Sequence, residues 1–157
     1  MKKSFAIYHL SFILLLVVSS GCRSNDSGFR VSGGSAQERA MVSGAVNNMV
    51  PFLQSRGFDR VQKPSGSYHL SVLPTTEVWR FPDGGEQGVG VHGGIRVGGR
   101  GGPNGMLIFR PLHPWIANHE VIHGLLARAG YIAESENHDR RAFDDGGHFP
   151  RGSRRIR

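Results

Sequence analysis

Residues 114–130 have the sequence PWIANHEVIHGLLARAG, and this stretch predicts the helix around which the domain folds. Its apolar residues recur at helical spacing and form one band along the helix: Trp115, Ile116, Val121, Ile122, Leu125, Leu126 and Ala129. Pro114 suits the first helical turn, where a missing N–H group costs nothing, and Gly130 suits the position just past the last turn. The pattern indicates a helix that buries one face against a sheet.

Two histidines lie one helical turn apart in this stretch. His119 and His123 share a face of the helix, so they can present two imidazole nitrogens to one ion. Glu120 is rotated off that face and can act as a general base on a metal-bound water. The HExxH arrangement resembles that of the zincin metallopeptidases. The resemblance implies a Zn²⁺ ion held by His119 and His123, a peptide or protein substrate, and Glu120 as the catalytic base.

A catalytic zinc usually takes three protein ligands, and the residues after the helix leave several alternatives for the third. The candidates are Glu134, Glu136, His138, Asp139 and His148. The best-known metzincin spacing requires a histidine at position 129, where this chain has Ala129, and no methionine follows Met106. The gluzincins place their glutamate farther along the chain than Glu134 or Glu136. Tyr131 and His148 are also candidates to stabilise an oxyanion, and no spacing selects between them.

The segment around His138 resembles the SprT-like zincins. In that family a histidine after the metal helix opens a further helix, and an aromatic residue follows one turn later. The corresponding residues here are His138 and Phe143, with Asn137 placed to cap the new helix. This resemblance covers only residues 114–145, and it implies His138 as the third metal ligand.

The rest of the chain predicts a small α+β domain. The expected elements are an N-terminal helix, a short and mostly antiparallel sheet, the metal helix and a short C-terminal helix. The four residues from Ser35 to Glu38 have the form of a capping box, so a helix is expected there, with a break or kink at Pro51 and an end at Gly57. Short strands are predicted over residues 60–62, 68–73, 76–81, 88–98 and 106–109.

The glycine-rich region before the metal helix bears on substrate binding. In zincins, an edge strand pairs with extended peptide substrate through main-chain hydrogen bonds, and this resemblance makes Val89–Val97 and Met106–Phe109 both candidates. The cluster Gly98–Gly102 is expected to be a mobile flap or a plain disordered loop. It lacks the lysine and following helix of a phosphate-binding loop, which excludes nucleotide binding there.

The amino terminus indicates export. Lys2 and Lys3 precede an apolar run from Phe5 to Val18, and small residues precede Cys22, the only cysteine. This order is typical of a secretory signal, and the run is short for a membrane-spanning helix. It resembles the bacterial lipoprotein signal, which implies lipidation of Cys22, a membrane anchor in the cell envelope, and the outer membrane where the organism has one. The alternative is ordinary secretion with an incidental thiol.

These signals divide the chain into four predicted parts: a signal peptide (1–21), a flexible tether (22–34), a zincin-like domain (35–148) and a basic tail expected to be disordered (149–157). Loss of residues 1–21 leaves 136 residues (157 − 21), enough for one compact domain. It also lowers the formal net charge from +7 to +5 (7 − 2), because Lys2 and Lys3 are removed. The remaining basic excess is expected to be a solvated end, so no nucleic-acid partner is predicted.

Three other functions are compatible with the sequence. The first is a lipid-anchored binding or scaffold protein whose metal site is structural or degenerate. The second is an enzyme that acts on envelope material other than protein, such as an amide of the cell wall. The third is a purely structural lipoprotein that binds no metal. Zinc binding and cleavage of peptides distinguish these functions from a metallopeptidase.

Overall fold

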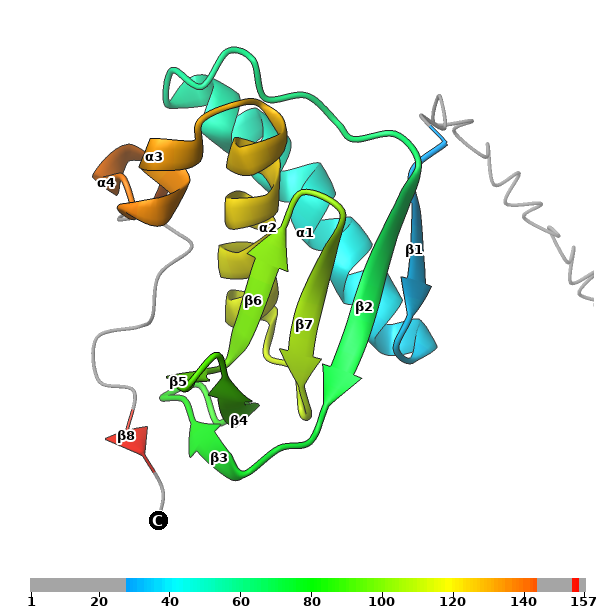
Figure 1. Cartoon of the computed structure of the whole chain (residues 1–157), viewed down its shortest axis with the longest axis vertical. Helices are drawn as coiled ribbons and strands as arrows, with labels where there is room; N and C mark the ends of the chain where they lie inside the picture. The colour runs from blue at the N-terminus through cyan, green and yellow to red at the C-terminus, as the bar shows by residue number, and fades with distance from the viewer. Residues whose placement is uncertain (1–27, 144–153, 156–157) are drawn as a thin grey trace, which may run out of the picture.

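Two long helices pack against one face of a four-stranded sheet in the computed structural model, which describes residues 28–143 and 154–155 (Figure 1). The helices are α1 (Ala36–Ser55) and α2 (Pro114–Arg128). The sheet has the order β1-β2-β7-β6, with strands β1 (Arg30–Gly33), β2 (Ser67–Leu73), β6 (Gly99–Gly102) and β7 (Gly105–Phe109). Side chains of both helices and of this sheet form the hydrophobic core.

A second, smaller sheet lies beyond the ends of these strands. Its order is β5-β4-β3-β8, with strands β3 (Glu77–Arg80), β4 (Glu86–His92), β5 (Ile95–Val97) and β8 (Arg154–Arg155). Two short helices, α3 (Ile132–Glu136) and α4 (Arg140–Phe143), follow α2 and fold back beside it (Figure 1). In the part of the chain that the structure describes, no helix combines the length and apolar character needed to cross a membrane.

The strand directions are more mixed than the sequence predicts. The second sheet and the β6–β7 pair are antiparallel, as expected. In the sheet that carries the long helices, however, β1–β2 and β2–β7 are parallel. Parallel neighbours require a crossover connection, and α1 supplies it between β1 and β2. The α+β class is therefore confirmed. The predicted antiparallel pairing prevails in the second sheet, whereas two of the three pairings in the sheet that carries the long helices are parallel.

Part of the predicted tether belongs to the folded domain. Arg30–Gly33 form β1, which pairs with β2 from Arg30 opposite Ser67 to Gly33 opposite Leu70. Phe29 and Val31 pack against the core. A tether that extends to residue 34 is therefore wrong, because strand pairing and apolar packing fix its last residues. Residues 22–27, including Cys22, and the signal peptide lie outside the described residues.

Three further segments differ from prediction. Residues 60–62 form no strand, although Val61 is fully buried and its carbonyl accepts a 2.8 Å hydrogen bond from Gln54. The glycine cluster expected as a flap or loop includes β6, an ordered edge strand. In the tail, Arg154–Arg155 pair with β3 as β8, so at least these two residues are not disordered. The other tail residues lie outside the described part.

The first helix begins as predicted. The Glu38 backbone N–H donates to the Ser35 hydroxyl at 3.2 Å, and the Ser35 N–H donates to the Glu38 carboxylate at 2.6 Å, which completes the capping box. Of the break or kink predicted at Pro51, the break does not occur, because α1 continues through it to Ser55. Gly57 follows the helix with a φ of 88°, a left-handed conformation that favours glycine.

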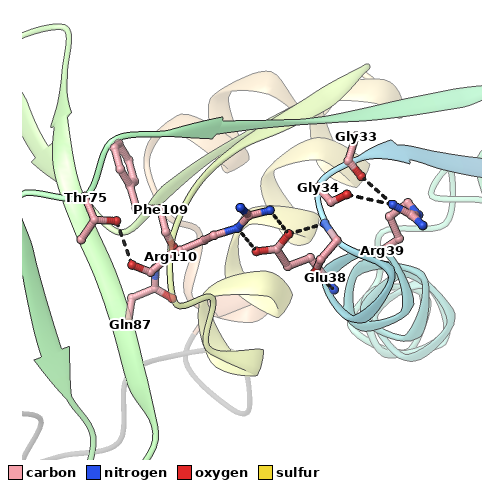
Figure 2. A network of polar contacts seen from close by, with 9 residues as sticks. Gly33, Gly34, Glu38, Arg39, Thr75, Gln87, Phe109 and Arg110 are labelled. Carbon is pink, nitrogen blue, oxygen red and sulfur yellow. Dashed lines mark hydrogen bonds and ion pairs between the residues drawn. The ribbon is translucent and has the colours of Figure 1, made fainter.

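An ion pair joins this helix to the end of β7. Figure 2 shows Arg110 donating to Glu38 through two nitrogens, at 2.7 and 2.9 Å, while the Arg110 carbonyl accepts from Thr75 at 2.8 Å. The Arg110 guanidinium lowers the pKa of Glu38 to about 2. Because α2 begins four residues after Arg110, this contact ties the start of α1 to the segment that leads into α2.

α2 has the predicted ends. Pro114 occupies its first turn, and Gly130 follows it with a φ of 78°. His113 is the N-cap, and its Nδ1 atom accepts a 3.2 Å hydrogen bond from the Trp115 backbone N–H. Its Nε2 atom lies 3.2 Å from the Asp83 carboxylate, and its ring stacks on Phe81. His113 therefore has a structural role at the start of α2.

Candidate metal centre

Three histidines converge in the structure. His119 and His123 project from α2, and His138 reaches them from the turn between α3 and α4. One ring nitrogen from each lies within 4.8 Å of the other two. The Nε2 atoms of His119 and His123 are 3.2 Å apart. Two nitrogens of a tetrahedral zinc site, each about 2.0–2.1 Å from the ion, are separated by about 3.3 Å, so the spacing of this pair suits zinc.

His138 sits in an unusual backbone conformation. Its φ of 51° lies in the left-handed region that residues other than glycine rarely adopt. It does not open a helix, and Asn137 is not an N-cap: α4 begins at Arg140, and the Asp139 carboxylate accepts from the Arg141 backbone N–H at 2.9 Å. Asn137 instead closes α3. The second helix begins two residues later than predicted, because the chain turns at His138 between two short helices instead of entering a helix there.

A single aromatic ring packs against all three imidazoles. Phe143 in α4 is fully buried. Its ring centroid lies 5.2 Å from that of His119, 4.7 Å from that of His123 and 4.8 Å from that of His138. The predicted aromatic residue one turn after His138 is therefore part of the site, where it limits the orientations that the three rings can take.

Ser135 fixes the orientation of His123. Its hydroxyl is 3.0 Å from the Nδ1 atom of His123 and 3.4 Å from the His123 carbonyl oxygen. When the Ser135 hydroxyl donates to the His123 carbonyl, its oxygen accepts a hydrogen bond from the Nδ1–H group of His123. The proton of His123 is then on Nδ1, and the lone pair of its Nε2 atom faces His119. Such an outer hydrogen bond sets the tautomer of a metal-binding histidine. Ser135 was not predicted, because its contact with His123 depends on how α3 folds against α2.

Glu120 is buried beside this cluster. Only 7% of its surface is exposed, and its carboxylate accepts a 2.6 Å hydrogen bond from the Gly101 backbone N–H in β6. Burial raises the pKa of Glu120 to about 7, while the Gly101 hydrogen bond and the nearby Arg100 act in the opposite direction. Glu120 thus has a fixed orientation and a pKa suited to accepting and returning a proton near neutral pH.

An open cleft of about 450 Å³ gives access to these groups. The three histidines and Glu120 line it together with β6, and Ile95 and Val97 border it from the second sheet. Exposure increases from His119, which is buried, through His123 to His138, which is exposed. An ion held by the three nitrogens would therefore face solvent on the His138 side.

The other candidates for the third ligand are placed differently. Asp139 forms a two-nitrogen ion pair with Arg141, at 3.1 and 2.9 Å, which lowers the pKa of its carboxyl group. Glu136 lines the cleft, but neither it nor Glu134 joins a group of possible metal ligands in the described residues. His148 lies outside those residues.

Two other side chains bear on the predicted site. Tyr131 packs against Phe58 and beneath Arg60 and does not line the cleft, so the structure gives it no part in the candidate site. Gln87 was not predicted. It is fully buried, donates to the carbonyl of Gly98 at 2.8 Å and accepts from the His113 N–H at 2.7 Å. It thereby fixes the approach to β6 against the start of α2.

Comparison of the chain with protein-family models, with curated proteins and with solved structures gives no match in any of the three. The function is therefore inferred from the residues of the site. Three convergent imidazoles can hold one divalent transition-metal ion, and a buried carboxyl group next to them can move a proton.

Proposed function

We propose that this chain is a zinc-dependent metallopeptidase with His119, His123 and His138 as metal ligands and Glu120 as general base. The observation that carries the proposal is the convergence of three histidine nitrogens within 4.8 Å beside a buried glutamate in an open cleft. Three protein ligands with one accessible position are typical of catalytic zinc, whereas structural zinc is usually enclosed by four. The exposure of His138 to the cleft therefore favours catalysis over a purely structural site.

The donor set suits zinc. Histidine nitrogens bind Zn²⁺ well, and the 3.2 Å distance between the Nε2 atoms of His119 and His123 is close to the nitrogen–nitrogen distance in tetrahedral coordination. When bound, zinc would polarise a peptide carbonyl and make water acidic enough to attack it near neutral pH. Other divalent transition metals bind imidazole, so the identity of the ion is part of the proposal.

The protein groups provide proton transfer and orientation. Glu120 would take the proton from the attacking water and pass it to the leaving amine. Gly101 holds one oxygen of the Glu120 carboxylate at 2.6 Å, so the other oxygen is available for this transfer. Ser135 keeps His123 directed toward the ligand position.

The edge strand β6 is suited to bind an extended substrate. It pairs with β7 on one side and, within the described residues, with no strand on the other, and all its residues line the cleft. Met106–Phe109 cannot have this role because β7 lies inside the sheet. Val89–Val97 borders the cleft through His92 at the end of β4 and through Ile95 and Val97 of β5. A peptide added along β6 would place its backbone beside Glu120.

Replacement of the proposed base tests this function. Glu120→Gln is expected to retain zinc and to lower peptide hydrolysis by at least about 100-fold, as loss of a general base usually does. Cleavage of a peptide library and the zinc content of the purified protein are the measurements. Glu136→Gln is the matched control, because Glu136 lines the same cleft but is exposed and lies outside the ligand group. Equal activity of wild type and Glu120→Gln would refute the assignment.

We also infer that Cys22 is lipidated and anchors the protein to the envelope membrane, on the basis of the signal-like residues before it. A Cys22→Ala variant is then expected in the soluble fraction, whereas the wild type sediments with membranes. Equal partitioning of the two would reject the anchor.

A further inference from the structure

The first sheet has a face that the long helices do not cover. Residues of its strands that point toward the helices are buried and apolar: Tyr68, Leu70, Met106 and Ile108. Cross-strand partners share a face, so the alternate residues point the other way. They include Arg30, Ser32, His69, Ser71, Leu107 and Arg100. In Figure 1, within the described part of the chain, no helix lies over this second face.

The charge of this open face has one sign. The four strands contain two arginines and one histidine, Arg30, Arg100 and His69, but no aspartate or glutamate. Arg100 is exposed, and its cross-strand partner is the apolar Leu107. Such a surface attracts anionic groups, and an arginine can hold a carboxylate through two parallel hydrogen bonds.

A groove of about 300 Å³ runs along this face. Its side-chain walls come from His69, Ser71, His92, Arg100 and Leu107. Gly102 and Gly105 stand in the same cross-strand row as His69, so the floor there is bare backbone. No aspartate or glutamate lines the groove.

The groove continues into the metal cleft. The groove and the cleft share four lining residues: His92, Arg100, Gly101 and Gly102. The edge strand β6 therefore forms the boundary at which the two hollows meet. A polypeptide that pairs with β6 beside Glu120 would have alternate side chains directed toward the groove, because successive residues of a strand point to opposite faces.

We propose that this groove binds an acidic segment of the polypeptide substrate, with Arg100 as the principal anchor. The proposal rests on the proposed metallopeptidase function, because the substrate is taken to reach the groove from the metal cleft. The substrate carboxylate bound by Arg100 would lie between His69 and His92, and the Ser71 hydroxyl adds a hydrogen-bond donor beside it. A single-stranded nucleic acid fits less well, because its bases require aromatic stacking platforms, and histidines are the only aromatic residues in either hollow.

Binding measured without turnover tests the groove. The full chain carrying Glu120→Gln is titrated with two fluorescent peptides of equal length, one with a run of glutamates and one with glutamines in the same positions. The acidic peptide is expected to bind at least about fivefold more tightly, the effect of about 1 kcal/mol from an exposed charge contact. The preference should weaken as salt is added.

Charge reversal identifies the anchor. Arg100→Glu is expected to abolish the preference and to favour a peptide with lysines at those positions. Lys63→Glu is the matched control, because Lys63 is exposed and lies outside both hollows. Equal binding of both peptides, an unchanged preference in Arg100→Glu, or tighter binding of an oligonucleotide of equal charge would each overturn the proposal.

Cleavage of the same peptides by the wild type separates this proposal from the proposed function. If the acidic peptide binds preferentially but neither is cut, the groove stands and the peptidase is rejected. If both peptides are cut at equal rates and bind equally, the peptidase stands and the groove is rejected.

Discussion

His123 directs its Nε2 atom toward the candidate ion while its other ring nitrogen is held by Ser135 at 3.0 Å. Phe143 packs under the three imidazoles, and the Gly101 N–H fixes the carboxylate of Glu120. The three histidines and Glu120 are thus each oriented by a neighbouring group that is not itself a proposed metal ligand. At the scale of single residues, these neighbours set the geometry of the site and are the most informative positions to change.

Removal of the Ser135 hydroxyl is expected to weaken zinc binding. Ser135→Ala leaves His123 without its outer hydrogen bond, and loss of such a partner typically costs about 10- to 100-fold in metal affinity. Competition for zinc with a chelating dye measures the change. Ser55→Ala is the control, since the Ser55 hydroxyl donates only to the Phe52 carbonyl on the exposed surface of α1. An affinity for zinc as high as in the wild type would show that Ser135 does not position His123.

The Glu38–Arg110 pair predicts how stability depends on pH. The pKa of Glu38 is lowered from 4.5 to about 2 in the folded protein, so its ionised form is the one that folding favours. The contribution of Glu38 to the free energy of unfolding is therefore complete above pH 4.5 and is lost as the pH falls toward 2. Glu38→Gln should lower the free energy of unfolding at neutral pH by about 1–3 kcal/mol, an amount limited by the partial exposure of Arg110.

Denaturant unfolding of wild type and Glu38→Gln at several pH values provides the measurement. The difference in the free energy of unfolding should shrink steadily from pH 4.5 downward. A constant difference over that range would mean that the ion pair does not shift the Glu38 pKa.

At the scale of elements, the site depends on how closely α2 approaches β6. A Cβ atom added at Gly101 would overlap the backbone carbonyl of Glu120, and one added at Gly124 would lie 2.7 Å from the Gly102 carbonyl oxygen. Glycines on both elements therefore allow backbone to meet backbone. This approach brings the Gly101 N–H within reach of the Glu120 carboxylate and explains why a glycine-rich segment forms the strand next to α2.

Alanine at Gly101 should force α2 and β6 apart. Gly101→Ala is expected to lower the free energy of unfolding by about 3 kcal/mol and to abolish activity, because overlap with backbone cannot be relieved by a side-chain rotation. Gly44→Ala is the matched control: nothing lies near its added Cβ, and alanine in a helix should stabilise α1 by about 0.5–1 kcal/mol. Wild-type stability of Gly101→Ala would contradict the close packing.

The elements that the sequence predicts well are those with local signals. The apolar period of α2, its end residues and the capping box of α1 are all encoded within a few turns of chain, and they are confirmed. β1 and β6 were missed for the opposite reason. The residues RVSG and GRGG have little intrinsic strand preference, and both become strands by pairing with distant partners.

At the scale of the whole molecule, the site joins parts of the fold that are far apart in sequence. α2 supplies two histidines and Glu120, the α3–α4 segment supplies His138, and β6 borders the cleft. Spacing alone could not choose between the five candidates Glu134, Glu136, His138, Asp139 and His148, and the position of His138 depends on the turn that follows α3. The resemblance to the SprT-like zincins selected His138, and the structure brings it to the other two histidines.

The zinc content of the purified protein tests the central claim most directly, and elemental analysis of the wild type, His138→Ala and His69→Ala would measure it. His69 lies on the open face of the sheet, outside the ligand group, so its variant controls for loss of any histidine. The wild type and His69→Ala are expected to hold a single zinc ion per chain, and His138→Ala much less. A wild type without zinc, or a full complement in His138→Ala, would contradict the three-histidine centre.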